Sequence, residues 1–383
     1  MPAPTLPRFA PVVGLALVSG STAVAQTPSG WQRPPLIDVH VHTSPAHYDT
    51  ASDLLAANGV SRFVNLSGGA PGDGLEESLE AARAFDGRVL VCANPEWERV
   101  AEPGFGEAQA RMLEKAAALG ARCVKVAKAL GLGVPDPADQ SRYLAVDDAR
   151  LDPMWAAAGR LGLPVFIHTG DPKAFFEPLT PANERWDELE VHPGWSFADP
   201  QFPRLETLLA QRDRVLERHR GTTFVGVHFG CFPENLDYTE QALAAHPNLY
   251  IDVAARVPEI GRHDPKRLHD LIVKYQDRVL FGTDLGVGRG LMLGSTGRER
   301  PTAADAFLFF ADHYRFFETL DRDIPHPTPI QGRWTINAIG LPPDVLDKLY
   351  AGNALRLLWG EASPSALDRR ALRDGPTPAD YFP

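Results

Sequence analysis

The stretch "LIDVHVHTSP" (residues 36–45) places three polar side chains, Asp38, His40 and His42, at every second position of an apolar run. Alternate residues of a β-strand share one face, so these three side chains point the same way. Two imidazoles at this spacing can bind one metal ion, but they can also be unrelated polar residues at a strand end. The stretch therefore predicts a strand, and the metal interpretation depends on ligands from elsewhere in the chain.

Seven similar apolar runs follow, separated by helix-like stretches. One of these, "LDPMWAAAGRLGLP" (residues 151–164), has a proline near its start and a glycine at its end, as helices do. Strands that alternate with helices predict a parallel sheet with helical crossovers. Eight such units over roughly 250 residues predict a closed (β/α)8 TIM barrel of the α/β class. The predicted strands are 36–41, 61–66, 88–93, 121–127, 164–168, 223–228, 249–254 and 278–284.

An open, doubly wound sheet is the alternative fold. Such sheets usually carry a glycine-rich phosphate loop after the first strand, and the first strand here ends in His-Val-His-Thr instead. Two long segments, 170–203 after strand 5 and 285–335 after strand 8, leave from strand ends where barrel active sites lie. We expect these loops to shape a substrate pocket. The predicted organisation is one barrel domain over residues 26–360 with a C-terminal helical cap, then a loosely structured tail over 361–383.

The first 25 residues read as a signal peptide. Arg8 precedes a short run of apolar and small residues that ends in Ala23-Val24-Ala25, which is typical of a cleavage site. The alternative is an unstructured or anchoring tail. We therefore expect an exported protein, periplasmic or secreted from a bacterium, with no membrane attachment after cleavage.

Composition narrows the range of partners. The chain of 383 residues has a formal net charge of −11 and no basic run, which argues against nucleic acid as a partner. A small-molecule substrate is expected, and a homodimer is left open. The three cysteines, Cys92, Cys123 and Cys231, are too few for a disulfide framework. Buried free thiols are expected, with a Cys92–Cys123 bridge as the alternative if their strands are neighbours.

Polar residues at the carboxyl ends of the predicted strands would face one cavity. Neutral imidazole and carboxylate suit Zn²⁺ and similar divalent ions, and catalytic sites keep one position open for water. The ion would lower the pKa of that water from about 15.7 toward 7. Asp284 could then bind the metal or accept the proton, and His228 could polarise a substrate oxygen or act as acid or base. The residues at the strand ends are His40, His42, Lys125, His168, His228 and Asp284.

Seven stretches resemble the amidohydrolase superfamily, and in particular its amidohydrolase-related branch of decarboxylases, lactonases and hydrolases, which includes aminocarboxymuconate-semialdehyde decarboxylase. The resemblance covers about residues 36–360. It implies one divalent metal, with zinc the expected ion, bound by His40, His42, His168 and Asp284, and a catalytic role for His228. Binuclear members use a carbamylated lysine on strand 4, so Lys125 leaves a binuclear site open. The stretches are "IDVHVH", "GARCVKV", "PVFIHTGD", "FVGVHFG", "LYIDVAAR", "VLFGTD" and "LYAGNALRLLWG".

Other residues have two interpretations each. Arg256 could pair with a substrate carboxylate or form a structural ion pair. Lys125 and Lys128 could bind substrate or support the structure. Asp171 could support His168, and Asn94 at the end of strand 3 could bind substrate or belong to a turn.

Three functions remain open at this point. The leading hypothesis is a metal-dependent hydrolase in which activated water attacks a C–O or C–N bond of a small organic substrate. The second is a metal-dependent non-oxidative decarboxylase that uses the same residues. The third is a catalytically silent barrel that only binds a ligand.

Overall fold

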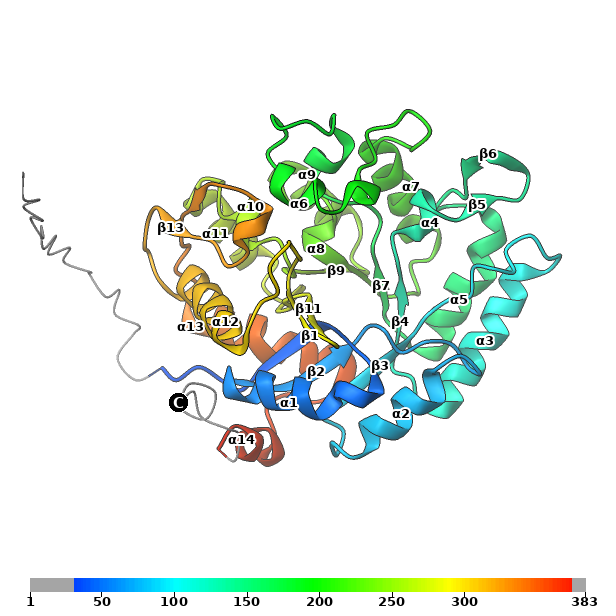
Figure 1. Cartoon of the computed structure of the whole chain (residues 1–383). Helices are drawn as coiled ribbons and strands as arrows, with labels where there is room; N and C mark the ends of the chain where they lie inside the picture. The colour runs from blue at the N-terminus through cyan, green and yellow to red at the C-terminus, as the bar shows by residue number, and fades with distance from the viewer. Residues whose placement is uncertain (1–30, 374–383) are drawn as a thin grey trace, which may run out of the picture.

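The eight predicted strands form a curled, mostly parallel sheet (Figure 1). The computed structural model describes residues 31–373, so the predicted signal peptide lies outside the described residues. Consecutive strands of the series are neighbours in the sheet, as a TIM barrel requires. The strands are β1 (Leu36–Thr43), β2 (Val60–Asn65), β3 (Val89–Ala93), β4 (Cys123–Val126), β7 (Val165–Ile167), β8 (Phe224–Gly226), β9 (Leu249–Asp252) and β10 (Val279–Leu280).

The barrel closes between its last strand and its first. Val39 donates its N–H to the Phe281 carbonyl at 3.1 Å, and Asp284 donates its N–H to the His40 carbonyl at 2.9 Å. The chain continues into β11 (Leu285–Val287), which pairs parallel with β1, and returns as the antiparallel β12 (Leu291–Leu293). The predicted α/β TIM barrel is confirmed over the open-sheet alternative. Closure makes the polar ends of β1 and β10, the first and last strands of the barrel, direct neighbours.

Helices cover the outside of the strands. Helix α5 (Asp152–Leu161) has Pro153 in its first turn and is followed by Gly162 in the left-handed conformation (φ 65°), as the sequence predicts. Figure 1 shows α2, α3 and α5 together on one side of the barrel and α12 (Ala303–Glu318) on the other. Within residues 31–373, no helix combines the length and apolar character that crossing a membrane requires. The helices between strands are α1 (Tyr48–Ala57), α2 (Leu75–Arg83), α3 (Phe105–Leu119), α5 (Asp152–Leu161), α7 (Leu205–Arg218), α9 (Leu236–Ala245) and α11 (Pro265–Lys274).

Extra elements gather at the carboxyl ends of the strands. The long segment after β7 contains α6 (Trp186–Leu189), and the segment after β10 contains β11, β12, α12 and a small hairpin. Another hairpin follows β4 and was not predicted. These elements form the rim of the barrel mouth. The remaining short elements are α4 (Ala129–Leu132), α8 (Val227–Gly230), α10 (Val257–Ile260), β5 (Pro135–Asp136), β6 (Asp139–Tyr143), β13 (Ile324–Pro325) and β14 (Thr335–Ile336).

The C-terminal cap is present, but the expected loose tail is wrong up to residue 373. The cap consists of α13 (Pro343–Asp347) followed by two wide, π-type helical stretches. After it, α14 (Ala366–Arg373) lies against β2. Arg62 on β2 donates to Asp368 on α14 at 2.8 Å, and both side chains are buried. This pair holds α14 against the barrel, because a buried charge requires a partner.

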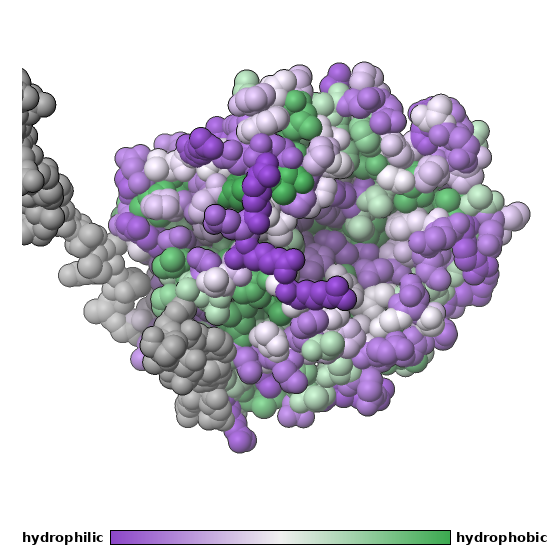
Figure 2. Space-filling model, viewed as in Figure 1, coloured by the Kyte–Doolittle hydropathy of each residue, from purple (hydrophilic) through white to green (hydrophobic). Residues whose placement is uncertain are grey.

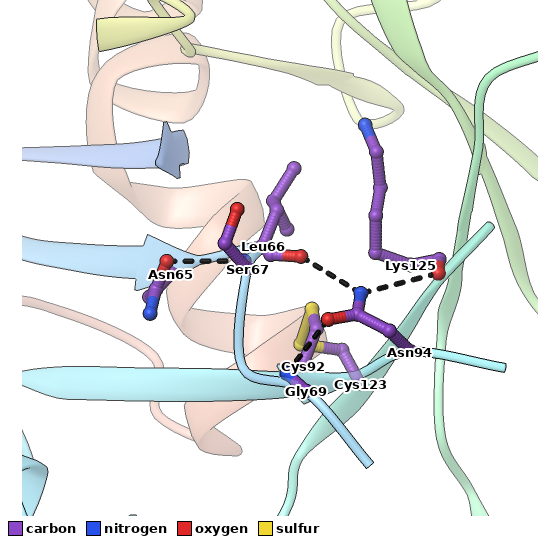
Figure 3. The surroundings of a disulfide bond; sticks show 8 residues. All are labelled: Asn65, Leu66, Ser67, Gly69, Cys92, Asn94, Cys123 and Lys125. Atoms are coloured by element: carbon purple, nitrogen blue, oxygen red, sulfur yellow. Dashed lines mark hydrogen bonds between the residues drawn. A yellow bond between two sulfur atoms is a disulfide. The ribbon is translucent and has the colours of Figure 1, made fainter. Parts of the chain in front are cut away.

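Two of the three cysteines form a disulfide, so the expectation of three free thiols is wrong. Cys92 on β3 and Cys123 on β4 are opposite each other in the sheet register, and their sulfur atoms are bonded (Figure 3). Both are completely buried. Cys231 is a buried free thiol, as expected. The sequence alternative of a bridge between neighbouring strands is the one that the structure contains.

Candidate metal centre

Three of the predicted ligands converge at the barrel mouth. Asp284 Oδ1 lies 3.5 Å from His40 Nε2 and 3.4 Å from His42 Nε2. The ligand atoms of these three residues all lie within 4.8 Å of one another. In the same view as Figure 1, the surface is hollowed near the middle, and hydrophilic side chains surround the hollow (Figure 2). Two imidazoles and one carboxylate in this arrangement could hold a divalent ion.

Both imidazoles are held through their other ring nitrogen. His40 Nδ1 lies 2.9 Å from Asp252 Oδ2, and His42 Nδ1 lies 2.6 Å from Ser67 Oγ. A carboxylate acceptor places the His40 proton on Nδ1 and leaves the Nε2 lone pair directed at Asp284. The donor set therefore fits a metal ion on an observation beyond residue type, because the Asp252 partner leaves His40 Nε2 unprotonated beside Asp284.

Asp38 lies below the cluster and supports it. Its carboxylate accepts the N–H of His40 at 3.0 Å and the N–H of Thr283 at 3.1 Å. Asp284 follows with a left-handed backbone (φ 63°), an uncommon conformation for a residue other than glycine. Burial raises the pKa of Asp38 to about 7. The opening motif thus contributes His40 and His42 to the site, and Asp38 aligns the ends of β1 and β10.

His228 lies beside the cluster. Its ring centroid is 4.7 Å from that of His40 and 4.4 Å from that of His168. Its backbone N–H donates to Asp252 Oδ1 at 2.7 Å, and its ring Nδ1 lies 2.9 Å from the Ala254 carbonyl. A carbonyl can only accept, so His228 carries its proton on Nδ1 and leaves Nε2 as an acceptor.

His168 is close to His228 but contributes no ligand atom to the cluster. Its Nε2 lies 3.3 Å from Asp171 Oδ1. Two groups among the described residues could hold a metal, the cluster above and a second formed by His40, His228 and Asp252, and His168 belongs to neither. Burial lowers the pKa of His168 to about 4, despite the neighbouring Asp171. The prediction that Asp171 supports His168 agrees with this contact, whereas a ligand role for His168 remains a prediction.

Three cationic side chains, Lys125, Lys128 and Arg256, lie near the site. Lys125 on β4 is buried, and its Nζ lies 3.3 Å from His40 Nε2. Lys128 forms an ion pair with Asp171 and lies within 6 Å of three aromatic rings from the long segment after β7. Arg256 is buried, its Nη2 is 3.9 Å from Asp171, and its Nε has no hydrogen-bond partner. Two cations thus share one carboxylate. The rings near Lys128 belong to Phe175, Trp195 and Phe197.

Burial and these charges control the protonation of the centre. Burial, together with the Lys125 ammonium, lowers the pKa of His40. Burial lowers the pKa of Lys125 as well. Burial alone would raise the pKa of Asp284, but the neighbouring His40 and His42 outweigh it and lower that pKa. His40 is therefore neutral and Asp284 ionised at neutral pH, which are the forms that bind metal.

Comparison with known proteins agrees with this geometry. The sequence model of a family described as Amidohydrolase matches residues 37–359. The chain belongs to the amidohydrolase family. Enzymes of this family generally depend on a metal, and the cluster of His40, His42 and Asp284 could hold one. Family membership indicates a metal-dependent enzyme without defining its reaction.

Several solved structures are similar to this chain. One is an uncharacterised TIM-barrel protein from Bordetella bronchiseptica, at 18% identity, 85% coverage of this chain, 98% of the other and a TM-score of 0.47. A 2,6-dihydroxybenzoate decarboxylase from Rhizobium has 16% identity, coverages of 66% and 88%, and a TM-score of 0.41. A dihydroorotase from Campylobacter jejuni has 12% identity, coverages of 85% and 84%, and a TM-score of 0.49. No curated protein matches the chain. Identities and scores this low indicate nothing about the reaction.

Two residues that contact the histidines of the centre, Asp252 and Ser67, were not predicted from the sequence. Asp252 ends β9 and contacts both His40 and His228, and Ser67 follows β2 and contacts His42. The signal for Asp252 is present, since "LYIDVA" places an acidic residue at the carboxyl end of a buried strand as "RVLFGTD" does. The signal for Ser67 is absent, because a serine after a strand is ordinary turn chemistry.

We predict that Asp252→Asn weakens metal binding about 10- to 100-fold. The asparagine amide can donate to His40 Nδ1, which would move the imidazole proton to Nε2 and block the ligand atom. Competition with a chromophoric chelator measures the affinity. Asp270→Asn on the exposed face of α11 is the matched control and should bind like the wild type. Equal affinities for the two variants would contradict the role given to Asp252.

A second prediction concerns Glu234, whose carboxyl group interacts electrostatically with Glu259 and Arg256. Burial and the nearby Glu259 carboxylate raise the pKa of Glu234 to about 7 from an ordinary 4.5. A raised carboxyl pKa gives stability that is present at low pH and is lost as the pH rises from about 4.5 through 7. Glu234→Gln should therefore gain about 1–3 kcal/mol relative to the wild type between pH 5 and pH 8. Urea unfolding of both proteins at the two pH values measures this, and an identical pH dependence would refute it.

Proposed function

We propose that the protein is a metal-dependent hydrolase that uses activated water to cleave a C–O or C–N bond of a small organic substrate. One divalent ion, expected to be zinc, would be held by His40, His42, Asp284 and, after its side chain turns from Asp171, His168. The observation that carries this proposal is the convergence of His40 Nε2 and His42 Nε2 on Asp284 Oδ1. Lys125 keeps a binuclear variant of the site open.

Asp284 and His228 would have different roles in the proposed reaction. A divalent ion at this centre supplies Lewis acidity and lowers the pKa of water from about 15.7 toward 7. Asp284, ionised at neutral pH, can accept a proton from the attacking water. His228 has its Nδ1 proton committed to the Ala254 carbonyl, so its Nε2 can accept a proton or a hydrogen bond. This supports a general-base role for His228 over polarisation of a substrate oxygen, which would need a donor.

Metal removal and isotope incorporation test the proposal. Dialysis against a chelator should abolish turnover, and one equivalent of Zn²⁺ should restore it. Turnover in H₂¹⁸O should place one ¹⁸O atom in the product of a lactone, ester or amide from a substrate panel. Full activity of the metal-free protein would overturn the metal proposal. Turnover that releases CO₂ without ¹⁸O incorporation would overturn hydrolysis.

One specific observation favours a decarboxylase as the second candidate. Arg256 is buried beside the site with an unpartnered Nε, and Lys128 shares Asp171 with it. A substrate carboxylate could take the unused donors of Arg256. Arg256→Gln should then raise KM for an aromatic acid and leave KM for an uncharged ester unchanged. An equal change for both substrates would assign Arg256 to a structural ion pair.

We also propose that the protein is exported. The buried Cys92–Cys123 bridge supports this, because disulfides persist in oxidising compartments and are rare in the cytosol. Fractionation of expressing cells into periplasm and cytosol, followed by mass determination of the mature N-terminus, tests it. Mature chains that begin near Gln26 are expected, and full-length protein in the cytosol would contradict export.

A further inference from the structure

The disulfide lies directly below residues that contact the candidate metal centre. Side chains two positions apart on a strand share a face. Cys123 is therefore on the same face of β4 as Lys125, and Cys92 is on the same face of β3 as Asn94, which follows the strand (Figure 3). Lys125 contacts His40 across the barrel, so this face is the barrel interior. The disulfide is thus a covalent connection inside the barrel, one layer below the site.

The first branch from the disulfide leads to His40. Lys125 follows Cys123 by two residues, and its Nζ lies 3.3 Å from His40 Nε2, the atom that faces Asp284. The backbone of Lys125 is held from the neighbouring strand, because Asn94 Nδ2 lies 3.4 Å from the Lys125 carbonyl (Figure 3). The position of Lys125 therefore depends on how β3 and β4 are fixed against each other.

The second branch leads to His42 through the turn that follows β2. Asn94 donates from Nδ2 to the Leu66 carbonyl at 3.0 Å and accepts the N–H of Gly69 at 2.7 Å through Oδ1. Between them, Ser67 places its Oγ 2.6 Å from His42 Nδ1. Asn94 therefore holds both sides of the turn that carries the partner of His42.

This turn also packs on the disulfide-bonded strand itself. A Cβ added to Gly68 would lie 2.2 Å from the Cys92 carbonyl oxygen, closer than any side chain can approach. The glycine is required here because the turn lies directly against the Cys92 backbone. Any displacement of Cys92 is thus transmitted to the neighbours of Ser67 by contact as well as by hydrogen bonds.

We propose that the Cys92–Cys123 disulfide is a positioning element for the metal centre: it fixes Lys125 against His40 and, through Asn94 and the 66–69 turn, Ser67 against His42. This rests on the proposed metal site for its functional meaning. The geometric claim about the two histidines stands apart from it, and a measurement without metal can test that claim.

The experiment is ¹⁵N NMR of the histidine side chains in metal-free protein, wild type against C92A/C123A. The imidazole nitrogen shifts of His40 and His42 should change in the double variant, because their partners move. His219 pairs with Asp152 away from the site and is the internal control, whose signals should stay in place. Unchanged signals for both His40 and His42 in a folded double variant would overturn the proposal.

Zinc affinity gives the functional readout. C92A/C123A should bind Zn²⁺ about ten-fold more weakly than the wild type. Leu216→Ala, a buried truncation in α7, is the control for general destabilisation and should keep the wild-type affinity. Affinities of the double variant within two-fold of the wild type would make the disulfide purely structural. A wild type that binds no zinc would instead overturn the proposed function and leave the NMR result to decide the geometric claim.

A second variant covers the case in which the double variant does not fold. Asn94→Ala keeps the disulfide and removes the side chain that joins the 66–69 turn to β3. The His42 signals should change in this variant while those of His219 do not. Unchanged His42 signals would refute the second branch.

Discussion

Asp284→Asn is expected to remove the bound metal and to lower kcat/KM about 10³-fold, or roughly 4 kcal/mol of transition-state stabilisation. Asp284 Oδ1 is the one oxygen near both His40 Nε2 and His42 Nε2 in the cluster. The asparagine amide has nearly the same shape but no negative charge, so it can neither neutralise a divalent ion nor accept a proton from water. Metal analysis per chain and steady-state kinetics measure the two effects.

The control for this variant is Asp277→Asn, an exposed carboxylate that pairs with Lys348. It should keep full metal content and full turnover. His42→Ala should resemble Asp284→Asn in metal content, since both remove a proposed ligand of the same ion. Normal metal content in both site variants would place the metal elsewhere and refute the assignment of this cluster.

C92A/C123A is expected to lower the free energy of unfolding by about 3–4 kcal/mol, because the bond closes a loop of about thirty residues in the unfolded chain. Guanidinium unfolding in the presence of a chelator, without reductant, measures this difference. Thiol titration of the denatured wild type should find one free cysteine, Cys231, and should find three only after reduction. Three free thiols in the untreated wild type would show that the bond does not form.

The fold could be predicted from the sequence because its signal is repeated. Each buried strand of a parallel barrel is a continuous apolar run, and each is followed by a helical stripe, so one weak unit is supported by seven others. The β5–β6 hairpin, with its exposed "DQSRY" strand, lacks that signal because no apolar face marks it. Helix α14 was missed for a similar reason: it is held by the Arg62–Asp368 pair, a contact between residues 306 positions apart.

The identity of the residues at the centre could be predicted, because they lie at strand ends. The orientation of their side chains could not, because it depends on contacts between residues. His40, His42 and Asp284 follow from their positions at strand ends together with the family resemblance. The orientation of their rings does not, because it depends on Asp252 and Ser67, which reach them from other strands. His168 shows the same limit, since a contact with Asp171 three residues later decides where its Nε2 points.

Barrel closure has a consequence for how the protein matures. Asp38 hydrogen-bonds directly to Thr283, 245 positions later, and the two ends of the candidate centre meet only at this seam. During synthesis or translocation, the histidines of β1 emerge first and stay without their carboxylate partner until most of the chain has followed. Contacts this distant in sequence form late in folding. A metal ion bound at this cluster would therefore be acquired in the compartment where the chain completes its folding, and the metal supply of that compartment would select the ion.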